Sequence, residues 1–238
     1  MSVTGVVAAL DFEARSLGRR SAQILVSTSG IGAGNAARAA RSLAAAGAAA
    51  LLSWGVAGAL DPSLRCGTVV LPIEVLRQGR RFQTDRLWRA RVAAALQGRV
   101  PLVSGALLTS EVAVAAAALK ASLFQQTGAA AVDMESAAVA EVAAELELPF
   151  LAVRVILDTA RDSLPDSILR SFQPPAAGVV GPAGDMPARP RLWPLLCAPG
   201  DWGALLRLAA QYRVAGRALR TCGRFAEPAR LAAAHGGG

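Results

Sequence analysis

The stretch AAAVDMESAAVAEVAAELELPFLAVRVILD, residues 129–158, decides the fold class. Its two ends, Ala129–Met134 and Phe150–Leu157, are short runs rich in apolar or β-branched residues and are predicted to be strands. The alanine-rich segment between them, Glu135–Leu146, is predicted to be a helix. A strand, a helix and a second strand in this order are typical of an α/β domain whose sheet is largely parallel.

The same alternation extends from this stretch toward both ends of the chain. Further apolar runs predict strands at Val3–Leu10, Gln23–Ser27, Ala49–Trp54, Thr68–Pro72 and Leu102–Leu108. Further alanine-rich stretches predict helices at Gly34–Ala46, Leu87–Leu96 and Glu111–Leu123. The sequence therefore predicts a single α/β domain, 1–238, with its core at about 1–162 and a central mixed, mostly parallel twisted sheet flanked by helices.

Two different segments follow the predicted core. Residues 163–194 hold most of the prolines and show no periodicity, which predicts a long surface loop. A last helix is predicted at about 202–220, with leucines on one face and arginines on a neighbouring face. This basic amphipathic helix has two interpretations: it packs on the sheet with its arginines in water, or it contacts an anionic membrane surface.

The composition excludes several classes of protein. The chain has 238 residues, of which 53% are hydrophobic and 18% charged, so it is long and apolar enough to bury a core with a pocket. Its three cysteines lack CxxC spacing and its single histidine is His235, which excludes structural zinc, a disulfide framework and a Ser/His catalytic pair. The 24 arginines are not interleaved with aromatic residues, so no nucleic-acid binding is expected. The N-terminus lacks the features of a signal peptide, and a cytoplasmic location is expected.

Polar residues follow four of the predicted strands, at the sheet edge where ligands collect in open α/β sheets. The four segments are Ala9–Glu13, Ser29–Asn35, Val132–Ser136 and Val153–Asp158. They supply three carboxylates, on Glu13, Glu135 and Asp158, that a shared cleft would use as base, sugar ligand and acid. A carboxylate after a strand also commonly caps the next helix, and this alternative applies to Asp11, Asp133 and Asp158 taken singly.

The run GIGAGN, residues 30–35, has a partial likeness to a dinucleotide-binding fingerprint. It lacks the third glycine, and no clear acidic residue follows about 20 residues later at a second strand end. A dinucleotide cofactor is therefore not expected. A glycine turn that opens a helix still provides a place for an anion or a nucleophilic water.

Taken together and in this order, the segments resemble the nucleoside phosphorylase and nucleosidase superfamily, and methylthioadenosine/S-adenosylhomocysteine nucleosidases most of all. The motifs that carry the resemblance are VVAALDFEA, SGIGAGNAA, SWGVAGALDPSLRCGTVVLP, VDMESAAVA and VRVILD. They cover about Val3–Arg161. The most specific element is VDMES followed some twenty residues later by VRVILD.

The resemblance implies a role for each matching position. Glu13 is similar to the carboxylate that holds and deprotonates the attacking water, and Asp158 to the acid that protonates the purine at N7. Met134 and Glu135 are similar to the floor and the hydroxyl acceptor of the ribose site, and Arg154 to a partner of the water or phosphate. The further substrate-binding positions implied are Ser29, Gly30, Gly55 and Val114.

The resemblance implies no metal and no redox cofactor, and it leaves inorganic phosphate open as a co-substrate. Arg15, Arg38 and Arg154 are the arginines considered for phosphate. Since superfamily members commonly form dimers or hexamers, a homo-oligomer is also expected.

The chain departs from the family pattern at three positions. Val56 replaces a polar residue of the G-x-A-G segment, and Leu157 precedes the presumed acid where Ser or Cys is common. Ala113 stands where the family places an aromatic residue that stacks on the base. These changes predict a more apolar pocket and leave the binding of the base undefined.

The segment after VRVILD is similar to that of the hopanoid-biosynthesis-associated phosphorylases, whose members are assigned to the removal of adenine from adenosylhopane. The likeness lies in the proline-rich segment and in RPRLWPLLCAPGDWGALLRLAAQYRVAGRALR, residues 189–220. A lipid-linked substrate would need an apolar exit and a route to the inner face of the membrane, which this tail and its Trp193 and Trp202 would offer. Two alternatives stay open: a methylthioadenosine/S-adenosylhomocysteine nucleosidase, and a non-catalytic nucleoside- or lipid-binding protein of the same fold.

Overall fold

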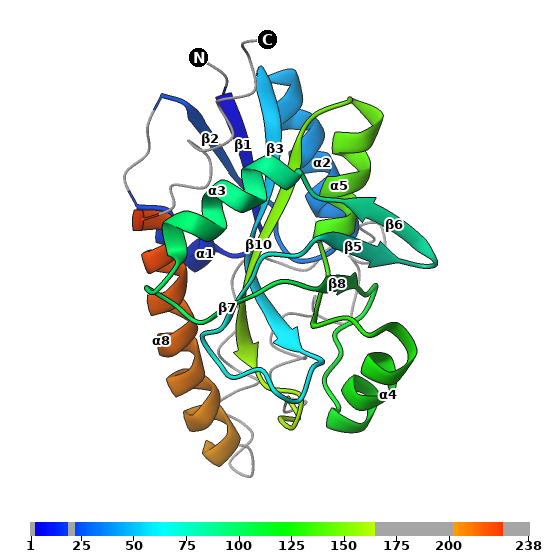
Figure 1. Ribbon diagram of the computed structural model, residues 1–238, viewed down its shortest axis with the longest axis vertical. Helices are drawn as coiled ribbons and strands as arrows, with labels where there is room; N and C mark the ends of the chain where they lie inside the picture. The colour runs from blue at the N-terminus through cyan, green and yellow to red at the C-terminus, as the bar shows by residue number, and fades with distance from the viewer. Residues whose placement is uncertain (1–2, 19–21, 165–201, 226–238) are drawn as a thin grey trace, which may run out of the picture.

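The computed structural model describes residues 3–18, 22–164 and 202–225, and Figure 1 shows them as three layers. A central sheet lies between two helices, α2 and α5, on one face and a group of three, α1, α3 and α8, on the other. The predicted loop at 163–194 lies outside the described residues from position 165 onward, and so does Trp193.

The sheet contains ten strands in the described part of the chain. They are β1 Val3–Ala8, β2 Ile24–Thr28, β3 Ala48–Ala59, β4 Val69–Val70, β5 Glu74–Arg77, β6 Arg80–Gln83, β7 Leu102–Val103, β8 Ala106–Thr109, β9 Ala131–Asp133 and β10 Phe150–Asp158. Six of the nine described strand pairs are parallel and three are antiparallel. The predicted α/β class with a mixed, mostly parallel sheet is confirmed.

Strand β3 holds the sheet together because it pairs with three other strands. Its first part runs parallel between β1 and β10, so that Leu52 is paired with Val6 on one side and Leu151 on the other. Its last residues, Gly58 and Ala59, pair antiparallel with β9. The polar segments that follow β1, β9 and β10 are thereby gathered around one strand.

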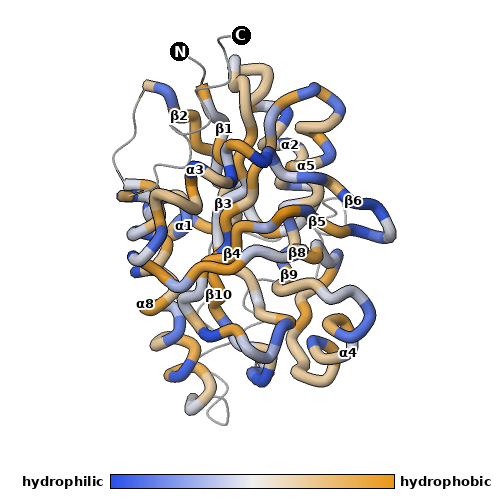
Figure 2. The backbone as a smooth tube through the Cα atoms, in the orientation of Figure 1, coloured by the Kyte–Doolittle hydropathy of each residue, from blue (hydrophilic) through white to orange (hydrophobic). Residues whose placement is uncertain are grey.

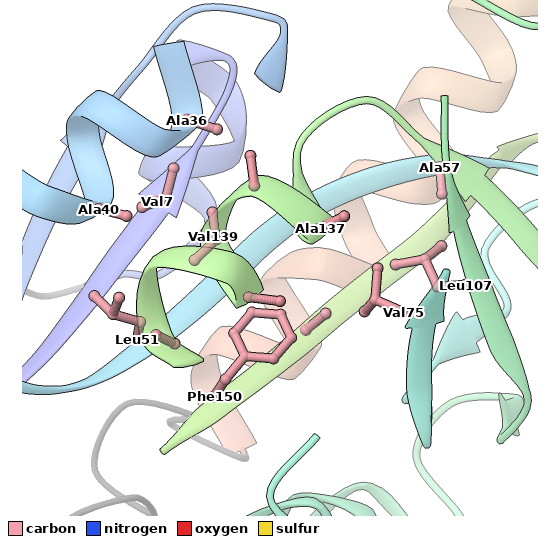
Figure 3. Packing of buried hydrophobic residues seen from close by; sticks show 14 of the residues in the cluster. Val7, Ala36, Ala40, Leu51, Ala57, Val75, Leu107, Ala137, Val139 and Phe150 are labelled. Carbon is pink, nitrogen blue, oxygen red and sulfur yellow. The ribbon is translucent and has the colours of Figure 1, made fainter. Parts of the chain in front are cut away.

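Helices α2 and α5 cover one face of the sheet with small side chains. The described helices are α1 Asp11–Ser16, α2 Ala33–Ala45, α3 Arg86–Leu96, α4 Ala117–Thr127, α5 Ser136–Glu145 and α8 Trp202–Phe225. Ala36 and Ala40 of α2 and Ala137 of α5 are buried in one cluster with Leu51 and Phe150 of the strands (Figure 3). Alanine lets helix backbones approach each other and the sheet closely, which explains why an alanine-rich sequence packs well here.

Helices α3 and α8 cover the other face with larger side chains. Trp88 of α3 and Leu219 of α8 are fully buried with Trp54 of β3. The C-terminal helix is therefore packed on the domain, and it extends to Phe225, five residues beyond its predicted end. Among the described residues no helix is long and apolar enough to cross a membrane.

Two predicted elements are wrong in their boundaries. The predicted strand Leu102–Leu108 is divided at Ser104-Gly105 into β7, which pairs with β4, and β8, which pairs with β5 and β9. The predicted helix Glu111–Leu123 begins only at Ala117. The segment before it is hydrogen-bonded to the chain after β10 and not within a helix, because the Ala115 carbonyl accepts from the backbone N–H of Leu164.

The sequence analysis missed the β5–β6 hairpin and helix α1. The hairpin turns at Gln78-Gly79, where both residues have positive φ, 48° and 79°. Figure 2 shows its tip as hydrophilic, and a Gln-Gly turn is a weaker hairpin signal than Asn-Gly. Helix α1 has only six residues and lacks a periodic apolar pattern.

We expect Gly223→Ala to lower the free energy of unfolding by about 1–3 kcal/mol, because a Cβ there would lie 2.5 Å from the Ser16 carbonyl oxygen and 3.0 Å from Leu17 Cα. Gly216→Ala is the matched control in the same helix. Its Cβ would meet nothing closer than 3.5 Å, from Arg220 Nη1, and alanine favours the helix by up to about 1 kcal/mol. Urea unfolding of both variants measures the difference. Equal effects would show that α8 does not dock tightly against the end of α1.

Candidate active site

A buried arginine forms the centre of the candidate site. Arg154 lies on β10 and is 1% exposed. Its Nε donates to Asp133 Oδ2 at 2.8 Å, and its Nη2 donates to the hydroxyls of Ser53, at 2.7 Å, and Ser136, at 3.0 Å. A guanidinium held by this many partners has a fixed orientation.

Asp133 connects this arginine to the rest of the sheet. Besides its pairing with Arg154, its carboxylate accepts from the Thr109 hydroxyl at 2.7 Å and from the Ser136 backbone N–H at 3.1 Å. The second contact satisfies a free N–H at the start of α5, so the capping role considered for Asp133 is correct in part. Asp133 joins β8, β9, α5 and β10 in one network.

Glu135 lies beside this network, at the N-terminal end of α5, and its Oε2 is 3.8 Å from Arg154 Nη2. Its Oε1 accepts a 3.0 Å hydrogen bond from the backbone N–H of Gly32, which precedes α2 and has a φ of 110° that favours glycine. Burial, together with the Asp133 carboxylate, raises the pKa of Glu135 to about 7.

Glu13 is brought to the same place by helix α1 and is 2% exposed. Its Oε1 accepts from the Val56 backbone N–H at 2.8 Å and its Oε2 from the Leu10 backbone N–H at 2.9 Å. Burial raises the pKa of Glu13 above its ordinary value, and the Arg154 guanidinium offsets part of the rise. Two backbone N–H groups therefore fix the carboxylate in place, and its pKa is raised as is common for acids and bases at active sites.

Gly55 explains how Glu13 and Arg154 come so close. It lies opposite Arg154 in the β3–β10 register. A Cβ at this position would collide with both Arg154 Nη1 and Glu13 Oε1. The glycine predicted as a substrate-binding position is thus required by the close approach of two charged side chains.

Ser29 and Gly30 lie in the turn that follows β2, and Met134 lies in the turn that follows β9. The backbone N–H groups of Ser29 and Gly30 donate to the carbonyls at the end of β1, and Gly30 has a φ of 83°. The Ser29 hydroxyl donates to the Gly30 carbonyl at 2.7 Å. Met134 is half-buried, and its backbone N–H lies 3.3 Å from Glu135 Oε2. The turn after β2 is thereby bonded to the end of β1, and through Gly32 it also contacts Glu135, as the turn after β9 does.

Asp158 forms a second charged centre at the end of β10, four residues or about 13 Å along the strand from Arg154. It is 5% exposed and forms an ion pair with Lys120 of α4, whose side chain is fully buried. Burial raises the pKa of Asp158, while the Lys120 ammonium opposes the rise. Gly58 of β3 lies beside it, where a Cβ would be 3.2 Å from Oδ2.

Apolar residues neighbour both centres in the chain or by hydrogen bond: the backbone N–H of Val56 donates to Glu13, and Leu157 precedes Asp158. Val56 and Leu157, the two apolar departures from the family pattern, are both partly exposed. Phe12 of α1 stacks on Tyr212 of α8, with ring centroids 4.1 Å apart. Val114 is buried in an apolar cluster with Leu60, Ala129 and Val132.

Sequence reasoning missed Asp133, Lys120 and the two serines on Arg154. Asp133 lies within the VDMES motif, so its position was a usable signal, whereas Ser53 and Ser136 become partners only when β3 and α5 are packed together. Lys120 had one signal: it is the only lysine in a chain with 24 arginines.

Two other observations bear on what this site can do. In residues 3–18, 22–164 and 202–225, no group of three or more His, Cys, Asp or Glu side chains is placed to hold a metal ion. A hollow of about 360 Å³ between β6 and α5, lined by Arg81, Thr84 and Phe150 among others, lies at the opposite end of β10. The chemistry available is that of two buried glutamates around an arginine, with a carboxylate–ammonium pair further along the strand.

The comparisons with known proteins agree with this architecture. Residues 11–173 match the model of the phosphorylase superfamily. The 5′-methylthioadenosine/S-adenosylhomocysteine nucleosidase of Neisseria meningitidis, solved with methylthio-immucillin-A, is 23% identical with a TM-score of 0.62 over 68% of this chain and 87% of that one. The corresponding Helicobacter pylori nucleosidase is 20% identical, with a TM-score of 0.61 over 67% and 86%.

A further similar structure is a futalosine hydrolase mutant of Helicobacter pylori, 19% identical with a TM-score of 0.60 over 68% of this chain and 87% of that one. No curated protein sequence matches the chain. At these identities the solved structures show a shared fold. The family match covers more than half of the chain, from α1 past the end of β10, and the chain therefore belongs to the phosphorylase superfamily.

Proposed function

We propose that the protein hydrolyses the N-glycosidic bond of a 5′-substituted adenosine and releases adenine. The observation that carries this proposal is the arrangement of Glu13, Glu135 and Asp158 at the ends of neighbouring elements, with two of them sharing one buried arginine. Family membership and the similar nucleosidase structures support the same reaction class.

The two glutamates suit the sugar end of the reaction. As the base departs, the ribose becomes oxocarbenium-like and positively charged, and nearby carboxylates stabilise that charge. In this proposal Glu135 accepts hydrogen bonds from the ribose hydroxyls above Met134. Glu13 takes the proton of the attacking water, a role that suits a carboxylate whose pKa is raised by burial.

Asp158 suits the base end of the reaction. A departing purine gains electrons from the broken bond and leaves more easily when an acid protonates it. Burial raises the pKa of Asp158, which favours the protonated form that this step needs. Asp158 is therefore proposed as the acid that protonates N7.

Water, not phosphate, is the proposed nucleophile. Nε and Nη2 of Arg154 already donate to Asp133, Ser53 and Ser136, and the carboxylates of Glu13 and Glu135 near it would repel a phosphate dianion. The other two arginines considered for phosphate are occupied in different ways. Arg15 is mostly exposed with Asp11 at 3.8 Å, and Arg38 donates to Asn35.

The specific substrate proposed is adenosylhopane, as the family resemblance implies. Apolar side chains near Glu13 favour a large apolar 5′ group: Val56 is partly exposed next to it, and the Phe12–Tyr212 pair lies between α1 and α8. A thioether such as methylthioadenosine is the alternative substrate of the same site.

Contact with an anionic membrane is part of the same proposal. Helix α8 carries Arg207, Arg213, Arg217, Arg220 and Arg224 and contains no acidic residue. All five arginines are exposed, and so are Leu206 and Val214 on the same helix. A basic face with scattered apolar side chains is typical of helices that bind anionic lipid surfaces.

We expect Asp158→Asn and Glu13→Gln each to lower kcat by roughly 10²–10⁴, the usual effect of losing a general acid or base. Glu135→Gln should raise KM and lower kcat together, because its contacts with the ribose change as charge develops. Glu145→Gln is the control, since this carboxylate lies on the surface and pairs with Arg41.

The measurement is the ultraviolet absorbance of released adenine, with methylthioadenosine and with an adenosine that carries a long apolar 5′ chain. Near-normal turnover by Asp158→Asn or Glu13→Gln would refute the assigned roles. A kcat/KM that is higher for methylthioadenosine than for the adenosine with the long apolar chain would refute the proposal that the substrate carries a large apolar 5′ group.

Turnover should not depend on inorganic phosphate. Parallel reactions with and without phosphate should release adenine at the same rate and give the free ribosyl product in both. A phosphate-dependent rate together with a ribosyl 1-phosphate product, detected by mass spectrometry, would identify a phosphorylase instead.

The protein should co-sediment with anionic vesicles at low ionic strength and be released as salt rises, at about 1 kcal/mol per basic residue near the surface. Changing Arg213, Arg217 and Arg220 to Gln should weaken vesicle binding and spare cleavage of a soluble adenosine analogue, since all three side chains are exposed. If the protein never sediments with vesicles, α8 is a structural helix only.

A further inference from the structure

The side chain of Lys120 is buried where a basic residue is costly. It is 0% exposed, within helix α4. Moving an ammonium group out of water costs several kcal/mol unless partners replace the lost hydration. A fully buried lysine in a chain that otherwise uses arginine calls for a specific role.

The three N–H groups of its ammonium have three partners. One donates to Asp158 Oδ2, and the others donate to the carbonyls of Thr159 and Asp162, both at 2.9 Å. A guanidinium is planar and larger, whereas an ammonium directs its three hydrogens to separate acceptors. Lysine therefore fits this site better than the arginine used elsewhere.

Among the described residues, Lys120 is the only cation that forms an ion pair with Asp158. Asp162 follows in the chain, and its own carboxylate is occupied by the Thr159 backbone N–H and hydroxyl and by Gln211 of α8. Cys66, before β4, lies near enough for the Asp158 charge to oppose its ionisation. The Lys120 ammonium is the only one of these groups that favours the Asp158 carboxylate.

The contact with Oδ2 determines where a proton on Asp158 resides. An oxygen that accepts a hydrogen bond from an ammonium is a poor place for a proton, so the proton of a neutral Asp158 lies on Oδ1. The backbone that follows Asp158 is also fixed, because the same ammonium donates to the carbonyls of Thr159 and Asp162.

We propose that Lys120 is a positioning residue for the acid: it directs the Asp158 proton to Oδ1 and stabilises the carboxylate that forms when this proton leaves. In the step, the C1′–N9 bond breaks, its electron pair stays with the purine, and the proton moves from Oδ1 to N7. Asp158 becomes a carboxylate paired with an ammonium that is already in place. This inference rests on the proposed function and adds a residue to it.

The pH profile separates this role from a structural one. Activity requires protonated Asp158, so it falls as pH rises through the pKa of Asp158. Because the Lys120 ammonium lowers this pKa, Lys120→Met should raise it and move the alkaline limb of kcat/KM to higher pH. The rate on the plateau should fall by about 10²-fold, the lower end of the effect of losing a general acid.

The experiment compares adenine release as a function of pH for the wild type, Lys120→Met, Lys120→Arg and Asp158→Asn. Lys120→Arg keeps a positive charge and should keep the alkaline limb near its wild-type position with a smaller loss of rate. Gln211→Leu is the control, because it removes a bond to the neighbouring Asp162 and leaves the Lys120–Asp158 pair unchanged. It should have the wild-type profile.

A double-mutant cycle completes the test. If Lys120 acts through Asp158, adding Lys120→Met to Asp158→Asn should change the rate less than twofold. The inference would be overturned if the rate losses of Lys120→Met and Asp158→Asn were additive. It would also be overturned if Lys120→Met and Lys120→Arg lowered the rate equally and left the alkaline limb where it is in the wild type. If Lys120→Met does not fold, the Lys120→Arg profile alone decides between these outcomes.

The two proposals fail in different ways. If the wild type releases no adenine, or if Asp158→Asn is as active as the wild type, the proposed function fails and this inference fails with it. If Asp158→Asn is impaired while Lys120→Met keeps both the rate and the limb, only the role of Lys120 is overturned.

Discussion

The burial of Arg154 among carboxylates is the interaction on which the rest of the site depends. One guanidinium faces the carboxyl groups of Asp133, Glu135 and Glu13, all of them buried, so that acidic groups outnumber the cation. Such a group is stable only when hydrogen bonds satisfy each member and part of the charge is neutralised by protons. Burial and the Asp133 carboxylate raise the pKa of Glu135 to about 7, in the direction of this neutralisation. In the proposed reaction, the same excess of carboxyl groups would favour a positively charged sugar.

The packing of the domain makes this charge cluster geometrically attainable. Strand β3 offers Gly55 where Arg154 and Glu13 meet, so the two side chains occupy the space that a Cβ would fill. Alanines on α2 and α5 bring these helices close to the sheet and place Gly32 and Glu135 within hydrogen-bond distance. On the other face, α3 and α8 cover the sheet (Figure 1), and their buried side chains include the large Trp88 and Leu219. The alanine-rich composition thus contributes to the site as well as to the core.

Strand β10 carries two charged centres that differ in their balance of acidic and basic groups. At Arg154 the carboxylates outnumber the cation, whereas at Asp158 a single carboxylate faces a single ammonium. In the reaction that we propose, the first centre would stabilise a developing cation, and the second would accept the negative charge left by a departing proton. Because β10 carries both Arg154 and Asp158, their separation is set by the strand rise and not by loop conformation.

The sequence by itself determined the alternation of strands and helices, and it placed Glu13, Glu135 and Asp158 near strand ends, because burial and periodicity are local properties of the chain. It did not determine which strands pair. The antiparallel addition of β9 to β3, the division of 102–108 and the late start of α4 depend on partners distant in the sequence. Tertiary structure alone decided that Asp133 and two serines hold Arg154 and that Lys120 holds Asp158. The physical reason is that a buried charge is tolerated only where the folded chain supplies its counter-charge, and no local pattern encodes where that partner lies.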